Sequence, residues 1–291
     1  MNFKASSSHK FARRVLPLFL LCALLSVSAF AQATPANSPP KVEATATTAA
    51  TAATAQEPND EKAEQIVRRA VEAQGGSAYL GVKTIIGRGY YSQFDKGFSL
   101  PPQTFIDYLV FPDRERTEFR GGRGRNIQTN DGERGWLFES STHSLVDMKP
   151  EQVADFRLAM RTSTDNLLRG WWRKEGARLT YLGRREAGLA KRNEAVRVTY
   201  PDGFTVDYEI GAKDFLPAKT FYKRKNAEGE EVAEEDRFAS YKVINGLTVP
   251  FVIDHYRAGA QSSRINYDSI EFNAPVPDTL FAKPANIKAI K

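Results

Sequence analysis

The sequence predicts a mainly β protein: a curled, half-open antiparallel barrel of about eleven strands, with an N-terminal helix and a central helical insertion as its lid. Three observations lead to this prediction. Apolar and polar residues alternate over most of residues 82–272, turn signals recur about every ten residues, and helical periodicity is confined to residues 60–74 and 150–172. An antiparallel sheet with this many strands usually curls, because strand twist accumulates across it.

The first 33 residues have the pattern of a secretory signal peptide. Four basic residues precede an apolar run over residues 15–30, and small residues allow cleavage after Ala31 or Ala33. The run is short for a membrane span, which takes roughly 17 to 25 apolar residues, although its retention as an anchor stays open. We therefore expect export to the periplasm.

The single cysteine, Cys22, lies within this apolar run, so the exported protein would hold no thiol, disulfide or cysteine metal site. The residues just ahead of it lack the small side chain that marks a lipidated cysteine. Residues 1–33 hold four of the 41 Lys and Arg and none of the 35 Asp and Glu, which leaves 37 against 35. The near balance of charge argues against a nucleic-acid partner.

Residues 34–58 consist mostly of Ala, Thr, Pro and Ser, with almost no large apolar side chains. Such a composition cannot bury enough surface to fold, so we expect a disordered linker. Residues 59–291 then form one β domain, of a size that sandwiches and barrels commonly reach.

An amphipathic helix is predicted over residues 60–74. Asn59 or Asp60 can cap its first turn, and Gly75 with Gly76 can end it in the left-handed geometry that glycine tolerates. Apolar residues at helical spacing form one face, which needs a sheet to pack on.

Period-two alternation begins after this helix and continues in two blocks. Three turn signals in the second block predict hairpins: Tyr200-Pro201-Asp202-Gly203-Phe204, Asn226-Ala227-Glu228-Gly229 and Asn245-Gly246. In the first block, strands are expected at residues 82–94, 103–111, 113–120, 125–130, 134–139 and 143–147.

Residues 150–172, between the two blocks, return to a helical period. Pro150 suits a first helical position, and a second short helix capped by Ser163 or Thr164 should follow. Trp171 and Trp172 come directly after it. We expect this insertion to cover one mouth or face of the curled sheet.

The chain offers few groups for catalysis. Outside the signal, histidine occurs only at His143 and His255, and no nucleophile elbow, P-loop, dinucleotide fingerprint or zinc motif is present. Asp254 and His255 are neighbours in a strand and should point to opposite faces. The sequence therefore predicts no catalytic residues, no metal, no cofactor and no enzymatic activity.

Two further motifs are interpreted as turns. Residues 121–125 look like an RNA-binding Gly-Arg box, but they lie between two strands of an exported protein. Asn130-Asp131-Gly132 lacks the further acidic positions of a calcium loop.

Aromatic residues are abundant, with 18 Phe, 11 Tyr and 3 Trp, and they fall mostly in strands with one apolar and one charged face. The apolar face could simply be core under the helices. Three short helices are few for a sheet of this size, however, and an uncovered apolar concavity suits a lipid or acyl chain. The predicted residues of this hydrophobic-ligand site are Ile106, Tyr108, Val110, Trp136, Phe138, Met160, Trp171, Trp172, Phe204, Val206, Tyr208, Ile210, Phe251 and Ile253.

The last strand carries a resemblance to a known family. Residues 265–273, INYDSIEFN, followed by residues 275–281, PVPDTLF, resemble the closing strand and exit turn of the outer-membrane lipoprotein-sorting proteins, the LolA/LolB-like family. The order of elements is also similar. The resemblance implies a half-open barrel lidded by helices, whose cavity holds lipoprotein acyl chains. The family has a lid-locking arginine on an early strand, for which Arg88 and Arg114 are candidates without a matching motif.

Two functions follow as expectations. The first is a periplasmic carrier or receptor for a lipidated protein or another hydrophobic ligand, with lipoprotein acyl chains or other lipid as partner and only peripheral membrane contact. The alternative is an envelope sensor or scaffold of the same fold that binds a partner protein. A hydrolase of unrecognised type is a third and weaker interpretation.

Overall fold

The computed structural model describes residues 59–290 apart from positions 123, 189–190 and 227. The predicted signal peptide and linker, residues 1–33 and 34–58, lie outside the described residues. Among the helices from residue 59 onward, none combines the length and the apolar character that crossing a bilayer requires.

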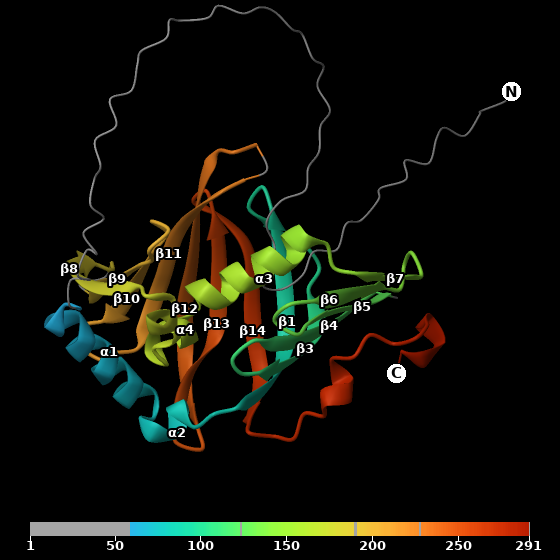
Figure 1. Ribbon diagram of the computed structural model, residues 1–291, viewed down its shortest axis with the longest axis horizontal. Coiled ribbons are helices and arrows are strands. Elements are labelled where there is room, and N and C mark those ends of the chain that lie inside the picture. The colour runs from blue at the N-terminus through green and yellow to red at the C-terminus, as the bar shows by residue number, and fades with distance from the viewer. Residues whose placement is uncertain (1–58, 123, 189–190, 227, 291) are drawn as a thin grey trace, which may run out of the picture.

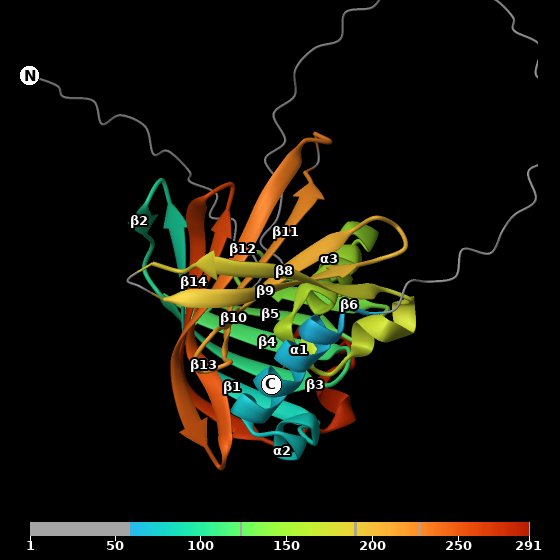
Figure 2. The same ribbon diagram turned by 90° about the vertical axis from the view of Figure 1, so that its left-hand side faces the viewer.

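The described chain is built on one 14-stranded antiparallel sheet, which is strongly curled (Figures 1 and 2). Its order is β7-β6-β5-β4-β3-β1-β14-β13-β12-β11-β10-β9-β8, with β2 paired to β1. Because β7 and β8 stand at the two ends of this order, the sheet is curled but open. The strands are β1 Thr84–Asp95, β2 Phe98–Ser99, β3 Gln103–Val110, β4 Arg114–Gly121, β5 Gly124–Asn130, β6 Gly135–Glu139, β7 Ser144–Asp147, β8 Arg178–Glu186, β9 Arg192–Thr199, β10 Thr205–Gly211, β11 Pro217–Lys225, β12 Glu231–Ile244, β13 Leu247–Arg257 and β14 Ala260–Phe272.

The predicted fold class, a curled half-open antiparallel sheet with few helices, is confirmed, but the strand count of about eleven is too low. The alternation of apolar and polar residues does not reveal the two-residue strand β2 or strand β8. In β8, the register shifts between Tyr181 and Gly183, and this irregularity interrupts the alternation by which a strand is recognised.

All three predicted hairpins form. Asn245 and Gly246 take φ values of 51° and 80° between β12 and β13, as a two-residue turn of this kind requires. The amide of Tyr200 donates to the carbonyl of Phe204 at 2.9 Å, which closes the β9–β10 hairpin.

Helix α1 (Glu61–Gln74) begins where the sequence predicts, because the side chain of Asp60 accepts hydrogen bonds from the amides of Lys62 and Ala63. Its apolar face packs on β8, β9 and β10 in the main hydrophobic core. The short helix α2 (Ser77–Leu80), which follows directly, is not predicted.

The helical insertion consists of α3 (Pro150–Thr162), α4 (Thr164–Leu168) and the 3-10 helix η1 (Trp171–Glu175). The hydroxyl of Ser163 accepts a hydrogen bond from the amide of Asn166 and so caps α4. Helix α3 crosses in front of the sheet in Figure 1, while α4 joins α1 in the main core. We call α3 and α4 together the lid.

The C-terminal residues form a segment with two 3-10 turns, η2 (Asp278–Leu280) and η3 (Ile287–Ala289). The indole nitrogen of Trp136 on β6 donates to the carbonyl of Phe281 at 2.8 Å. Ile287 and Ile290 pack against a small apolar cluster that contains Trp136. This segment therefore covers one face of β4–β6.

Candidate ligand-binding cavity

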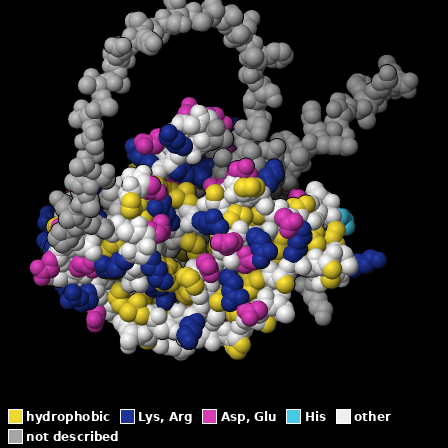
Figure 3. Space-filling view, in the orientation of Figure 1, with side chains coloured by type: hydrophobic (Ala, Val, Ile, Leu, Met, Phe, Trp, Pro, Cys, Tyr) yellow, Lys and Arg dark blue, Asp and Glu magenta, His cyan; other side chains and the backbone are white. Residues whose placement is uncertain are grey.

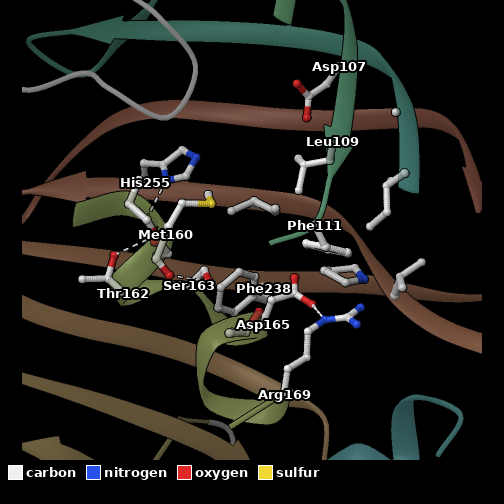
Figure 4. A pocket seen from close by; sticks show the side chains of 18 of the residues that line it. Asp107, Leu109, Phe111, Met160, Thr162, Ser163, Asp165, Arg169, Phe238 and His255 are labelled. Atoms are coloured by element: carbon white, nitrogen blue, oxygen red, sulfur yellow. Dashed lines mark hydrogen bonds and ion pairs between the residues drawn. The ribbon is translucent and has the colours of Figure 1, made fainter. Parts of the chain in front are cut away.

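A cavity of about 220 Å³ lies between the lid and the concave face of the sheet. It is lined by side chains from the lid, from β1 and β3, and from β11–β14, and most of its wall is apolar. Figure 4 shows several of these side chains, and Figure 3 shows apolar side chains beside charged ones on the same face of the molecule. Representative apolar lining residues are Leu109, Phe111, Met160, Phe238, Ile253 and Phe272.

Gly87 on β1 shapes the floor of the cavity. A Cβ atom at this position would lie 2.7 Å from the ring of Tyr267 on the neighbouring strand β14. Only a residue without a side chain lets this ring approach β1 so closely, and both Gly87 and Tyr267 line the cavity.

Arg169, directly after α4, fastens the lid to the segment that precedes β1. Its guanidinium donates to the carbonyl oxygens of Tyr79, Leu80 and Val82 at 3.1–3.2 Å. The same group lies 4.2 Å from the ring centre of Phe111, which lines the cavity.

A chain of ion pairs fastens α3 to the sheet. Arg224 on β11 contacts Asp155 on α3 and Glu234 on β12, both at 3.0 Å, and Arg257 on β13 reaches the same Glu234 at 2.9 Å. Burial raises the pKa of Asp155 to about 6, with Glu234 and Glu151 adding to the effect. Burial also raises the pKa of Glu234 to about 7, against the opposing influence of Arg224.

His255 on β13 lines the cavity, and its Nδ1 lies 2.5 Å from Oδ1 of Asp236 on β12. Burial opposes protonation of this imidazole, but Asp236 beside it raises the pKa above its ordinary value. As predicted, Asp254 points the other way: it pairs with Arg264, away from the cavity.

Asp107 on β3 is an acidic residue of the cavity wall. It is 3% exposed and accepts a hydrogen bond from the hydroxyl of Thr117 on β4 at 2.8 Å. Burial raises the pKa of Asp107 to about 7. Burial and the neighbouring Asp107 also raise the pKa of Glu115, which is 2% exposed. The two carboxyl groups therefore favour a state in which at least one is neutral.

The predicted site residues are distributed over three places. Met160, Trp171 and Ile253 line the cavity, and Phe251 packs beside it in a cluster with Val249. A second group belongs to the main core beneath α1 and α4 rather than to the cavity. This group is Trp172, Phe204, Val206, Tyr208 and Ile210.

The third group requires a correction, because it lies on the convex face. Asp107 and Leu109 line the cavity, so the alternating positions Ile106, Tyr108 and Val110 face the opposite way. Trp136 and Phe138 share that outer face, since the strand register aligns Trp136 with Thr129, Thr129 with Arg116 and Arg116 with Tyr108. The C-terminal segment covers Trp136 and Phe138 there.

The sequence pattern predicts the wrong inner face for β3 because Asp107 interrupts the apolar row that lines the cavity. Phe105, Leu109 and Phe111 are apolar on this parity, but the acidic residue between them makes Ile106, Tyr108 and Val110 look like the apolar row. The residues on either side of Asp107 in this row, Phe105 and Leu109, are both apolar. They are a sign in the sequence that this row faces inward.

The two candidates for a lid-locking arginine are engaged elsewhere. Arg88 pairs with Glu271 on β14, and Arg114 pairs with Asp278 at 2.6 Å. Arg169, which directly follows the lid, instead binds the segment before β1. Across the described residues, no group of three or more His, Cys, Asp or Glu side chains is placed to hold a metal ion.

Comparison of the sequence with models of known protein families and with curated proteins gives no match. Solved structures do match. A DUF1329 family protein from Desulfovibrio piger aligns with a TM-score of 0.54 at 10% identity, over 76% of this chain and 97% of that protein.

Two further structures bear on the predicted resemblance. A putative outer membrane lipoprotein-sorting protein domain from Vibrio parahaemolyticus aligns with a TM-score of 0.52 at 13% identity, over 77% of this chain and 97% of the other. A LolA superfamily protein from Nitrosomonas europaea gives a TM-score of 0.50 at 13% identity, over 76% and 97%. The fold of this chain is therefore LolA-like, as the closing strand and the order of elements predicted.

Proposed function

We propose that this protein is a periplasmic carrier or receptor whose cavity binds an apolar chain, either the acyl chain of a lipidated protein or another lipid. The observation that carries the proposal is the cavity itself, because its wall is mostly apolar and carries a few convergent polar groups. Sites for small apolar ligands typically have this character. Similarity of fold to a protein named for lipoprotein sorting supports the same class of ligand.

The way in which the lid is fastened also supports this proposal. Its contacts with the sheet include the ion pair of Asp155 with Arg224 at 3.0 Å and that of Arg161 with Asp202 at 2.8 Å. Helix α3 buries only Val153, Phe156 and Thr162. A helix such as α3, which is held by a few polar contacts, can move aside at lower cost than a core helix, and an acyl chain needs such a route of entry.

Binding of an apolar fluorescent probe to the purified protein tests the proposal. Leu109→Trp would fill the cavity, and we expect it to weaken probe binding at least about tenfold. Val243→Trp is the matched control, because Val243 is 71% exposed on β12 and its replacement leaves the cavity open. Circular dichroism would check that both variants fold.

Mass spectrometry of the protein isolated from a periplasmic extract would identify the natural ligand. A co-purifying lipid or acylated peptide is the expected result. A stoichiometric protein without lipid would favour the alternative function as a scaffold. A well-folded domain that binds neither probe nor lipid would overturn the proposal.

A further inference from the structure

A strip of buried polar side chains lies on the inner face of β3, β4 and β5, continuous with the cavity wall. The strand register aligns Asp107 with Thr117 and Thr117 with Gln128, and it aligns Glu115 with Asn130. All five side chains share the face that lines the cavity at Asp107, and each is at most 5% exposed. We call these five residues the inner polar strip.

Several atoms of the inner polar strip have no hydrogen-bond partner among the described residues. They are both carboxylate oxygens of Glu115, the amide oxygen of Gln128, and both polar atoms of the Asn130 side chain. A buried polar atom without a partner typically costs about 1–3 kcal/mol, so such a group calls for an explanation. When Glu115 is ionised, four of these five atoms are acceptors, and the strip then suits a ligand that brings donors.

The charges around the cavity favour a cationic donor. The basic residues of the wall are already engaged, since Arg169 pairs with Asp165 at 2.7 Å and Arg224 pairs with Asp155 and Glu234. Asp107, by contrast, forms no ion pair with a described residue, and neither does Glu115. An anionic head group placed at this end of the cavity would meet the carboxyl group of Asp107, with Glu115 beside it, while the basic groups of the wall, His255 included, already face carboxylates such as Asp236.

We propose that the cavity takes a single-chain amphiphile with a primary amine head group, whose ammonium lies against Asp107 and Glu115 while its chain lies among Leu109, Phe111 and Ile253. An ammonium group carries three N–H donors and a positive charge, which match the acceptors and the acidity of the inner polar strip. Figure 4 shows Asp107 beside Leu109 at one end of the lining side chains, with Arg169 at the other. This inference rests on the proposed function and specifies its ligand.

Isothermal titration calorimetry with three octyl probes tests the inference. At about pH 7.5, where an alkyl amine is protonated, octylamine should bind at least about tenfold more tightly than octanol, and octanoate most weakly. In the double variant Asp107→Asn, Glu115→Gln, the affinity for octylamine should fall to within about threefold of the affinity for octanol. The two substitutions remove the negative charges but keep the shape of the side chains. Octanol binding should not change in this variant.

Asp268→Asn is the matched control, because it removes one negative charge from an exposed position on β14, away from the cavity. It should leave all three affinities within about twofold of the parent protein. Octanol or octanoate binding as tightly as octylamine would overturn the inference and leave the proposed function standing. Failure of all three probes to bind a folded protein would overturn both.

Discussion

Arg169 and Asp165 form an ion pair of 2.7 Å at the end of the lid, and both side chains also bind the segment that precedes β1. The hydroxyl of Tyr79 on α2 donates to the same carboxylate at 2.7 Å, and Arg169 in turn donates to three backbone carbonyls beside it. The Arg169 side chain is only 7% exposed. Each group thus satisfies the other in a setting that is buried at Arg169 and partly exposed at Asp165, where an unpaired charge would be costly.

Replacement of Arg169 should therefore destabilise the protein. In Arg169→Ala, Asp165 loses its counter-charge and three carbonyls lose their donor, so we expect the free energy of unfolding to fall by about 3–5 kcal/mol. Arg169→Lys should recover only part of this loss, because an ammonium cannot reproduce the planar fork. Urea denaturation measures both effects.

Arg192→Ala provides the comparison for this prediction. Arg192 pairs with Glu186 at 3.0 Å, but both side chains are more than 60% exposed, and such pairs contribute at most about 1 kcal/mol. Equal effects of the two alanine variants would contradict the assigned role of Arg169.

Gly89 on β1 lies where the backbone of β14 comes closest. A Cβ atom there would be 2.0 Å from the carbonyl oxygen of Asn266 and 2.8 Å from the Cα of Tyr267, beside a register shift in the ladder. Because backbone atoms cannot turn aside as a side chain can, Gly89→Ala should cost about 2–4 kcal/mol.

Gly124→Ala at the start of β5 is the matched test for Gly89. The nearest atoms to a Cβ at Gly124 are 3.5 and 3.6 Å away, in ordinary van der Waals contact. We expect a change of less than about 1 kcal/mol in thermal or urea unfolding. A comparable loss in both variants would show that close approach is not the reason for glycine at position 89.

Local features of the fold were predictable because each is encoded within a few residues. Asp60 caps α1 through its own side chain, and Asn245 with Gly246 takes the backbone angles that a two-residue hairpin needs. These signals do not depend on distant parts of the chain. Helix limits and hairpins therefore agree closely with expectation.

The cavity wall was less predictable, because it depends on which parity of each strand faces inward. On β3, the acidic residue Asp107 faces the cavity, so the row of side chains that lines it does not look apolar in the sequence. On β6, the apolar residue Trp136 faces outward, because a segment 145 positions later in the chain covers it. Both cases reverse the ordinary rule that apolar side chains of a strand face the interior and charged ones face solvent. Sequence alternation alone cannot reveal such long-range contacts.

Trp136 provides a test of that C-terminal cover. In Trp136→Phe, the carbonyl of Phe281 loses its donor and the apolar cluster loses part of its volume, so we expect a loss of about 1–3 kcal/mol. Hydrogen exchange of residues 278–290 should become faster. Phe98→Leu, at a position that is 77% exposed, should change neither quantity. Unchanged exchange in Trp136→Phe would contradict the anchoring role.

The buried carboxyl pair predicts a specific dependence of stability on pH. Burial raises the pKa of Asp107 to about 7 and also raises the pKa of Glu115, so the folded state holds protons that the unfolded state releases at lower pH. The stability that these neutral carboxyl groups contribute is complete below the pKa values of the unfolded chain and is lost as the pH rises through about 7. Asp107→Asn, Glu115→Gln removes this titration.

We therefore compare the free energy of unfolding of the double variant with that of the parent protein. The difference, variant minus parent, should rise by about 2–4 kcal/mol between roughly pH 5 and pH 8. Urea denaturation at several pH values measures this difference, and other titrating groups cancel in it. Asp268→Asn should give a flat difference, because its side chain is exposed. A flat difference for the double variant as well would mean that the pair is ionised in the folded state, which would require a cation bound beside Asp107 and Glu115.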